Sequence, residues 1–185
     1  MLDKIIHETE DKMKKAVEFT RQELSKLRSG KATVALLDDI RIDYYGQKLP
    51  IAQTSSVSTP DAHLITVQPW DKSIIQEIEK AILAANIGIN PTNDGTVIRL
   101  PVPLLTEERR KELVKVAKKF VEDGRISIRN IRRDSNEHLK KAEKDEHVSE
   151  DERKRGETEV QKLTDKYIKQ LDDILAGKEK EIMEV

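Results

Sequence analysis

The sequence contains no cysteine, and only 3% of its residues are aromatic. A chain without cysteine forms neither disulfides nor thiolate metal sites, which agrees with a reducing cytosol. Few aromatic residues leave little material for a large globular core. No apolar run approaches the roughly 18 residues needed to span a bilayer, and the opening stretch MLDKIIHETEDKMKK is unlike a signal or transit peptide. We therefore expect a cytoplasmic protein with no membrane segment.

Sequence motifs of common enzymes and metal sites are absent as well. The seven glycines are scattered singly, so the chain has neither a P-loop nor a GxGxxG pattern. The histidines lie far apart, without the spacing of metal ligands; they are His7, His63, His138 and His147. Ser149 is better explained as a helix cap than as a nucleophile. We therefore predict a protein that is not an enzyme and needs neither a cofactor nor a metal.

Charge is abundant but balanced. Charged residues make up 37% of the chain, yet 34 basic and 35 acidic side chains give a net charge of −1. A pI near 6.5 argues against a uniformly basic nucleic-acid coat but says nothing about a local basic stripe. High charge with few aromatic residues is typical of a protein built from long helices.

Apolar residues recur at helical spacing in three long segments. In residues 2–28 a stripe repeats every seven residues, formed by Ile6, Met13, Thr20 and Leu27. Gly30 is placed to end this helix as its C′ residue. A second helix is expected to begin at Thr106, a capping residue followed by two acids, and a third at the capping box Ser149-Glu-Asp-Glu152.

The second and third helices, separated by the charged segment KAEKDEHV, also have one apolar face each. These faces are formed by Leu113, Ala117, Phe120, Val121, Ile128, Ile131 and Leu139, and by Val160, Leu163, Tyr167, Leu171, Ile174, Leu175 and Ile182. Because each helix is polar outside one stripe, none is stable alone, and we expect the three to pack as a long bundle.

Residues 31–105 follow a different pattern. Alternating apolar residues predict a short amphipathic helix at 72–86 and four strands, at 40–44, 49–51, 63–68 and 96–100. This segment carries six basic and eight acidic residues, a net charge of −2, whereas the rest of the chain carries +1. Trp70, at the end of a strand, is interpreted as a packing residue. The pattern is typical of a small α+β domain.

We therefore predict an α+β fold in which residues 1–29 and 106–185 form a long three-helix bundle. A small α/β domain, residues 31–104, is inserted after the first helix. The two connections are short and contain glycine and proline, so hinges that permit rocking are expected near 29–32 and 101–105. The candidate hinge residues are Ser29, Gly30, Lys31, Pro101, Pro103 and Leu104.

One stretch of the second helix, RISIRNIRRD, is unusually basic. A stripe about 100° wide contains four arginines, Arg125, Arg129, Arg132 and Arg133. Glu122 and Glu137 are spaced to pair with the outer two, but the inner two have no acid three or four residues away. A row of guanidiniums suits bidentate contacts with RNA phosphates, although most charge runs are solvated surface. Composition and spacing leave both interpretations open.

The chain also carries a series of short stretches in a fixed order. They are Leu27-Arg-Ser-Gly-Lys-Ala32, Leu36-Leu-Asp38, Tyr44-Tyr-Gly46, Pro69-Trp-Asp-Lys72, Asn90-Pro91 with Gly95, Arg99-Leu-Pro-Val-Pro103, Leu105-Thr-Glu-Glu-Arg-Arg-Lys111, Arg129-Asn-Ile-Arg-Arg-Asp134 and Gln161-Lys-Leu-Thr-Asp165. With this order and spacing, the chain resembles the bacterial ribosome recycling factor family over essentially its full length. Two positions depart from the family's pattern: Val34 stands where many members have proline, and Gly124 replaces a better helix former.

The resemblance implies a factor without catalytic activity of its own that binds the post-termination ribosome. In this family the helical bundle lies on ribosomal RNA of the large subunit. The factor acts with elongation factor G, which hydrolyses the GTP and is thought to push the hinged domain, to split the ribosome into subunits and release it from mRNA. The family's RNA-contacting basic positions fall on Arg28, Arg129 and Arg132, with Arg110 and Arg133 as further candidates. We expect a monomer.

The alternative class is a coiled-coil adaptor or chaperone that binds protein partners through its helical faces. Salt dependence discriminates between the two classes. Contacts to RNA phosphates weaken steeply as the salt concentration rises, whereas an apolar interface between helices does not.

Overall fold

The computed structural model describes residues 1–145 and 147–184. The chain divides into two compact units. The helical unit consists of Met1–Ser29 and the chain from Glu107 onward, and the small unit is Gly30–Thr106. Long helices that pack together are combined with two small sheets, so the predicted α+β class is confirmed.

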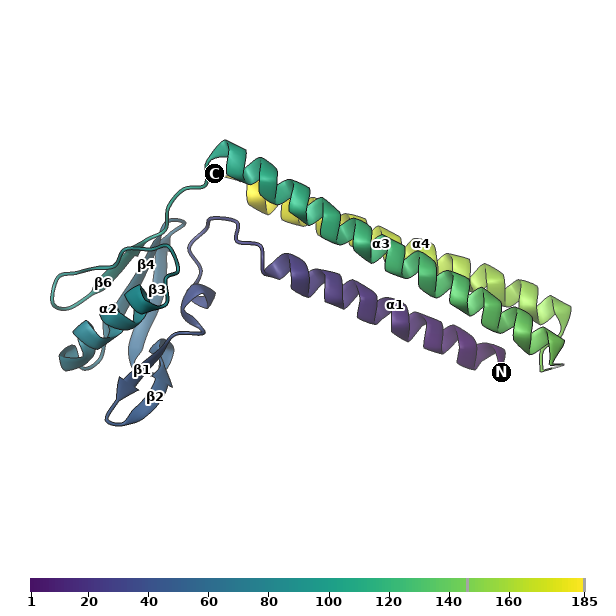
Figure 1. Cartoon of the computed structure of the whole chain (residues 1–185), viewed down its shortest axis with the longest axis horizontal. Helices are drawn as coiled ribbons and strands as arrows, with labels where there is room; N and C mark the ends of the chain where they lie inside the picture. The colour runs from purple at the N-terminus through teal and green to yellow at the C-terminus, as the bar shows by residue number, and fades with distance from the viewer. Residues whose placement is uncertain (146, 185) are drawn as a thin grey trace. The chain divides into compact units, whose positions relative to one another are not determined.

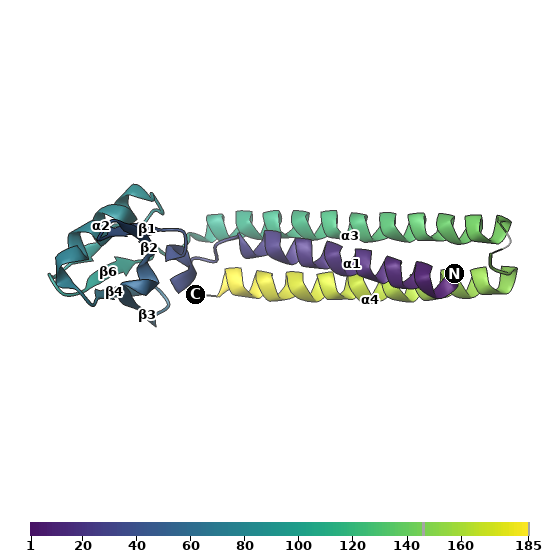
Figure 2. The same ribbon diagram turned by 90° about the horizontal axis from the view of Figure 1, so that it is seen from below.

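The helical unit is a bundle of α1 (Leu2–Ser25), α3 (Glu107–Lys144) and α4 (Glu150–Met183). The three helices lie side by side; α1 and α4 run in one direction and α3 in the opposite one (Figures 1 and 2). Each helix has one buried stripe and is otherwise largely exposed. Among the described residues, no helix is both long enough and apolar enough to cross a membrane.

The predicted apolar stripes form the core of the helical unit. Fully buried side chains from all three helices include Met13, Ile128, Leu139, Leu171 and Ile182. A polar pair is buried with them: the hydroxyl of Thr9 donates to the Ile5 carbonyl and lies 2.7 Å from the hydroxyl of Ser135. This pair joins α1 to α3 inside the core with its hydrogen bonds satisfied, so its burial is not penalised.

The predicted start of α4 is confirmed, whereas the predicted end of α1 is wrong. Ser149 Oγ accepts a hydrogen bond from the Glu152 N–H, and the Glu152 carboxylate accepts one from the Ser149 N–H at 2.8 Å, so the predicted capping box is confirmed. In contrast, α1 ends at Ser25, and Lys26 still has a right-handed conformation. Gly30, with a φ of +79°, lies in the connection, so its prediction as the C′ residue is wrong.

Gly124 of α3 marks a close approach between helices. A Cβ atom at this position would lie 2.5 Å from Thr20 Oγ1 and 3.2 Å from Leu171 Cδ1. Thr20 is not free to turn away without loss, because its hydroxyl donates to the Ala16 carbonyl at 3.1 Å. Gly124 lies within the unbroken α3, so packing against α1 and α4 explains the glycine.

The small unit contains two sheets and a helix, α2 (Ile75–Ala84). One sheet is the hairpin β1 (Arg41–Tyr44) and β2 (Gln47–Pro50). The other is antiparallel, in the spatial order β3 (Ser55–Asp61), β4 (Leu64–Pro69), β6 (Ile98–Pro101) and β5 (Thr92–Asn93). Short 3₁₀ turns span Val34–Leu37, Ile51–Gln53 and Lys72–Ile74. The unit has its own core, which includes Ile42, Ile65, Ile78, Ile98 and Leu100.

Strand prediction succeeds in the centre of the larger sheet and fails at its edges. β4 and β6 are central and overlap the predicted strands. β3 and β5 are not predicted, because edge strands with mostly exposed side chains lack apolar alternation. Trp70 follows the buried Pro69 at the end of β4 and is 69% exposed, since consecutive residues of an extended chain face opposite ways. Its interpretation as a packing residue is wrong.

The second connection between the units begins later than predicted. Pro101, a predicted hinge residue, ends β6 and is paired with Leu64 of β4. The N–H of Val102 then donates to the His63 carbonyl at 2.8 Å. Because these pairings hold the backbone to the sheet, the hinge candidates that remain on this side are Pro103 and Leu104.

The first connection is tied to the small unit at Ala32, whose N–H donates to the Ala62 carbonyl at 2.7 Å. Before it lie the predicted hinge residues Ser29, Gly30 and Lys31. A Cβ atom on Gly30 would lie 2.6 Å from Leu105 Cγ. The first connection therefore contacts Leu105 of the second at a glycine that also needs a positive φ.

We expect Gly124→Ala to destabilise the helical unit although alanine is the better helix former. The new methyl group must displace Thr20 or Leu171, and such overpacking costs about 1–3 kcal/mol, against a gain of about 1 kcal/mol in helix propensity. Gly177→Ala on α4 is the matched control, because nothing lies within 4 Å of its Cβ position. The control is expected to gain about 1 kcal/mol.

Thermal and urea unfolding followed by circular dichroism measure both variants. If Gly124→Ala gained as much stability as Gly177→Ala, the close approach of α1 and α4 to Gly124 would be wrong.

Candidate nucleic-acid interface

The four arginines Arg125, Arg129, Arg132 and Arg133, here called the basic stripe, lie along the middle of α3. Two neighbouring residues of α3, Ile128 and Ser135, are buried. The stripe therefore borders the seam of the bundle, as its position on the helical wheel predicts. Its members nevertheless differ in what neutralises them.

Arg125 links α3 to α4. Its Nε lies 3.0 Å from Asp172 Oδ1 and its Nη1 lies 3.0 Å from Glu122 Oε2, and only 22% of its side chain is exposed. Its hydrogen bond to Asp172, and more weakly that to Glu122, raises the pKa of Arg125, although burial acts in the opposite direction. The predicted pairing with Glu122 is confirmed. Two carboxylates neutralise this guanidinium, which makes Arg125 a structural link.

Arg129 is paired, contrary to the prediction. Its Nη1 lies 3.2 Å from Glu122 Oε1, seven residues back along α3. The pair lies outside the usual spacing of three or four residues, because two long side chains span two helical turns. Glu122 thus serves two arginines, and hydrogen bonds from Arg125 and then Arg129 lower the pKa of Glu122. Arg129 remains 43% exposed, so the pair is open to solvent and exchange.

Arg132 contacts a neutral side chain. Its Nη1 donates to Gln161 Oε1 of α4 at 3.3 Å, and no carboxylate of the described residues lies within ion-pair distance. Its charge is therefore not cancelled by a neighbour. Sequence periodicity places Gln161 on the polar side of α4 and gives no signal of this contact, although Gln161 lies in one of the stretches that carry the family resemblance.

Arg133 is exposed, and within the described residues it makes no ion pair. The predicted partner, Glu137, is not bound, so that prediction is wrong. An arginine placed before its acid on a helix is the less favourable order, and exposed pairs gain little against the ordering of two long side chains. Arg132 and Arg133, rather than Arg129 and Arg132, are thus the stripe's available charges.

The other two candidates lie towards the end of the bundle where α1 stops and α3 starts. Arg28 is exposed and follows the end of α1. Arg110 is in the first turn of α3, and its buried Nε has no hydrogen-bond partner in the described part of the chain. Arg110 is about 22 Å along the helix axis from Arg125, at 1.5 Å per residue. The structure therefore does not gather the five predicted RNA-binding arginines at one point.

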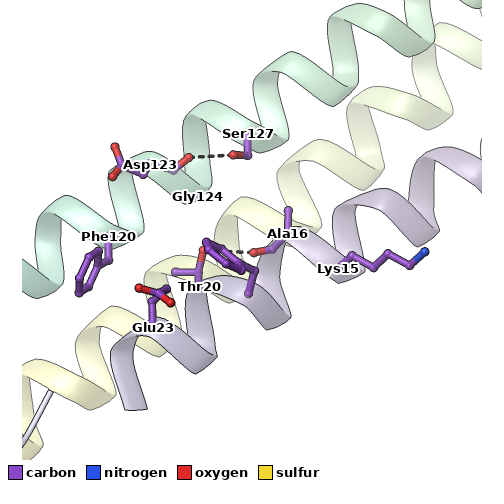
Figure 3. A pocket seen from close by; sticks show the side chains of 9 residues that line it. Lys15, Ala16, Thr20, Glu23, Phe120, Asp123, Gly124 and Ser127 are labelled. Carbon is purple, nitrogen blue, oxygen red and sulfur yellow. Dashed lines mark hydrogen bonds between the residues drawn. The ribbon is translucent and has the colours of Figure 1, made fainter. Parts of the chain in front are cut away.

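Other kinds of site find little support. No group of three or more potential metal-ligating side chains occurs among the described residues. A cavity of about 580 Å³ lies between α1 and α3 beside Gly124 (Figure 3). It is lined by Lys15, Ala16, Phe19, Thr20, Glu23, Phe120, Asp123, Gly124 and Ser127. The hydroxyls of Thr20 and Ser127 donate to carbonyls of their own helices. These lining residues form no catalytic constellation.

Comparison with known proteins identifies the family. The model of the ribosome recycling factor family matches residues 20–183. A ribosome-recycling factor of Syntrophomonas wolfei is 56% identical over 185 residues and covers 100% of both chains. One of Symbiobacterium thermophilum is also 56% identical, with the same coverage. The chain therefore belongs to the ribosome recycling factor family.

Solved structures agree over the whole chain. A solution structure of the ribosome recycling factor is 45% identical, with a TM-score of 0.75 over 100% of this chain and 98% of the other. The ribosome recycling factor of T. thermophilus, in models with E. coli elongation factor G bound to the E. coli post-termination complex, is 42% identical. Its TM-score is 0.63, with 100% of both chains covered.

We expect Arg125→Gln to lower the stability of the helical unit by about 1 kcal/mol, because it removes a partly buried link between α3 and α4. Arg133→Gln is the control on the same helix and is expected to change stability by less than about 0.5 kcal/mol. Chemical unfolding in low and high salt measures both. Equal losses for the two variants would contradict the division of the stripe into structural and available arginines.

Proposed function

We propose that this protein binds the post-termination ribosome through ribosomal RNA of the large subunit. With elongation factor G, it promotes dissociation of the ribosome into subunits and release from mRNA. Membership of the family supports this proposal, as does the similarity to a factor described together with elongation factor G on a post-termination complex. The observation that carries it is Arg132, a guanidinium held at the α3–α4 seam by Gln161, with no carboxylate partner among residues 1–145 and 147–184.

The proposed anchor uses the available charges of the basic stripe. Guanidiniums bind phosphate oxygens through paired N–H donors, and release of counterions from the RNA provides much of the binding free energy. Arg132 and Arg133 are adjacent on α3 and offer two such groups. Arg129 contributes once the phosphate displaces Glu122 from its exposed pair. Arg28 and Arg110 extend the contact towards the other end of the bundle.

The proposed lever is the small unit, which two short connections join to the helical unit. The bundle is long and stiffened by three continuous helices, whereas each connection is a few residues long. A push on the small unit by the GTP-hydrolysing partner would therefore be absorbed at Ser29–Lys31 and Pro103–Leu104. In this proposal the factor itself contributes position and stiffness, and the partner supplies the chemical energy.

We expect Arg132→Glu to weaken binding to purified large ribosomal subunits tenfold or more and to make its salt dependence shallower by about one counterion. Arg21→Glu on α1 is the matched control, because it makes the same change in net charge at an exposed arginine that is already paired with Glu18. Sedimentation at several salt concentrations measures both variants.

Wild-type affinity of a folded Arg132→Glu variant would contradict the RNA anchor. If binding by the wild-type protein were insensitive to salt, the competing class, an adaptor that docks on protein through apolar helix faces, would be favoured instead.

We expect Gly30→Ala to slow subunit splitting severalfold while leaving ribosome binding unchanged. The added methyl group meets both an unfavourable φ of +79° and the side chain of Leu105. Gly46→Ala in the β1–β2 turn is the control, because its φ is +82° but nothing lies within 4 Å of its Cβ position. Light scattering of ribosomes with elongation factor G and GTP measures splitting. Equal slowing by both variants would argue against a hinge at Gly30.

A further inference from the structure

Three polar side chains form a chain from α3 to α4. Arg132 Nη1 donates to Gln161 Oε1 at 3.3 Å, and Gln161 Nε2 donates to Asp165 Oδ1 at 2.9 Å. Gln161 and Asp165 are one helical turn apart on α4, a spacing at which glutamine and aspartate stabilise each other on a helix surface. A single amide thus joins an arginine of one helix to a carboxylate of the next.

The direction of the Gln161 amide follows from the chemistry of its neighbours. A guanidinium has only donors, and an ionised carboxylate has only acceptors. Turned the other way, the amide would place its NH₂ against Arg132 and its oxygen against Asp165, which are two repulsive contacts. Asp165 therefore keeps the oxygen of Gln161 directed at Arg132.

A neutral partner orients an arginine without cancelling its charge. Arg125 and Arg129 pair with carboxylates, whereas Arg132 donates to the amide oxygen of Gln161. Its remaining N–H donors form no hydrogen bond within the part of the chain that the structure describes. A 3.3 Å contact is at the long end for N–H···O bonds. The contact therefore orients the guanidinium and leaves its other N–H donors available to a second acceptor.

We propose that Gln161 is a positioning residue for RNA binding: supported by Asp165, it holds the Arg132 guanidinium on the α3–α4 seam with its charge intact for a phosphate. A pre-oriented side chain loses less conformational freedom when it binds. A carboxylate in place of the amide would hold Arg132 as well but would neutralise it. This inference rests on the proposed function and adds Gln161 and Asp165 to it.

The first experiment exchanges the neutral partner for a charged one. Gln161→Glu is expected to pair with Arg132, lower the affinity for purified large ribosomal subunits about tenfold and make the salt dependence shallower by about one counterion. Gln22→Glu on α1 is the matched control, because it makes the same substitution at an exposed position on another helix. Equal effects of the two variants would overturn the proposal.

The second experiment removes the hydrogen bonds but keeps the shape and charge. Gln161→Met is expected to lower affinity a few fold with an unchanged salt dependence, because Arg132 keeps its charge but loses its orientation. Gln161 is exposed, so its variants should fold, which helical circular dichroism verifies. Wild-type affinity of Gln161→Met would overturn the positioning role.

A double variant separates this inference from the proposed function. In an Arg132→Gln background, Gln161→Glu should lower affinity no more than Gln22→Glu does, because the residue to be positioned is gone. If Arg132→Gln alone binds as tightly as the wild-type protein, the RNA anchor itself fails. If Arg132→Gln weakens binding but Gln161→Glu has the same effect with and without Arg132, only the role of Gln161 is wrong.

Discussion

Burial of the apolar stripe of α1 is the constraint on which the rest of the structure depends. A helix of this kind is marginal in water by itself and becomes stable only by packing, here against α3 and α4, which follow the inserted small unit in the chain. Met13 and Val17 bury their side chains against those distant segments. The chain must therefore return to the bundle after the insertion, and α3 runs antiparallel to α1. Both connections consequently emerge at the same end of the bundle.

The same packing decides what each side of α3 can do. Gly124 serves the close contact with α1 and α4, and Ile128 fills the core. The basic stripe lies beside this buried seam, where α4 is within reach of its side chains. Contacts with α4 therefore give the arginines of the stripe different roles. Asp172 neutralises Arg125, whereas Gln161 orients Arg132 without neutralising it. The charge that Arg125 and Arg132 leave available for the proposed RNA contact is thus set by the residue that α4 places opposite each of them.

The fold could be predicted from the sequence wherever burial imposes a period. The seven-residue repeat through Met13 and the capping box at Ser149 gave the helices, and the alternation in β4 and β6 gave the central strands. Hydrophobic periodicity did not predict edge strands such as β3, the exposure of Trp70 or the end of α1. Their conformations depend on neighbours that periodicity does not describe.

The site was predictable only as a stripe. Helical spacing identifies the four arginines, but it cannot show that Glu122 reaches back to Arg129 over two turns, or that Gln161 of another helix meets Arg132. Nor can it show that Arg133 leaves Glu137 unbound. Those facts depend on side-chain reach and on how α4 is aligned with α3, which are properties of the assembled bundle.

The hydrogen bonds that close the base of the small unit also bear on how the chain folds. Contacts between α1 and α3 join residues that are far apart in sequence, and ordering a long loop between them slows folding and costs entropy. Ala32 bound to Ala62, and Val102 bound to His63, draw the two ends of the insertion towards adjacent residues of one β-turn region. Once the small unit has formed, the loop that α1 and α3 must close shrinks to the two short connections. The folded insertion thereby holds close together the ends of α1 and α3, the two helices that it separates in the sequence.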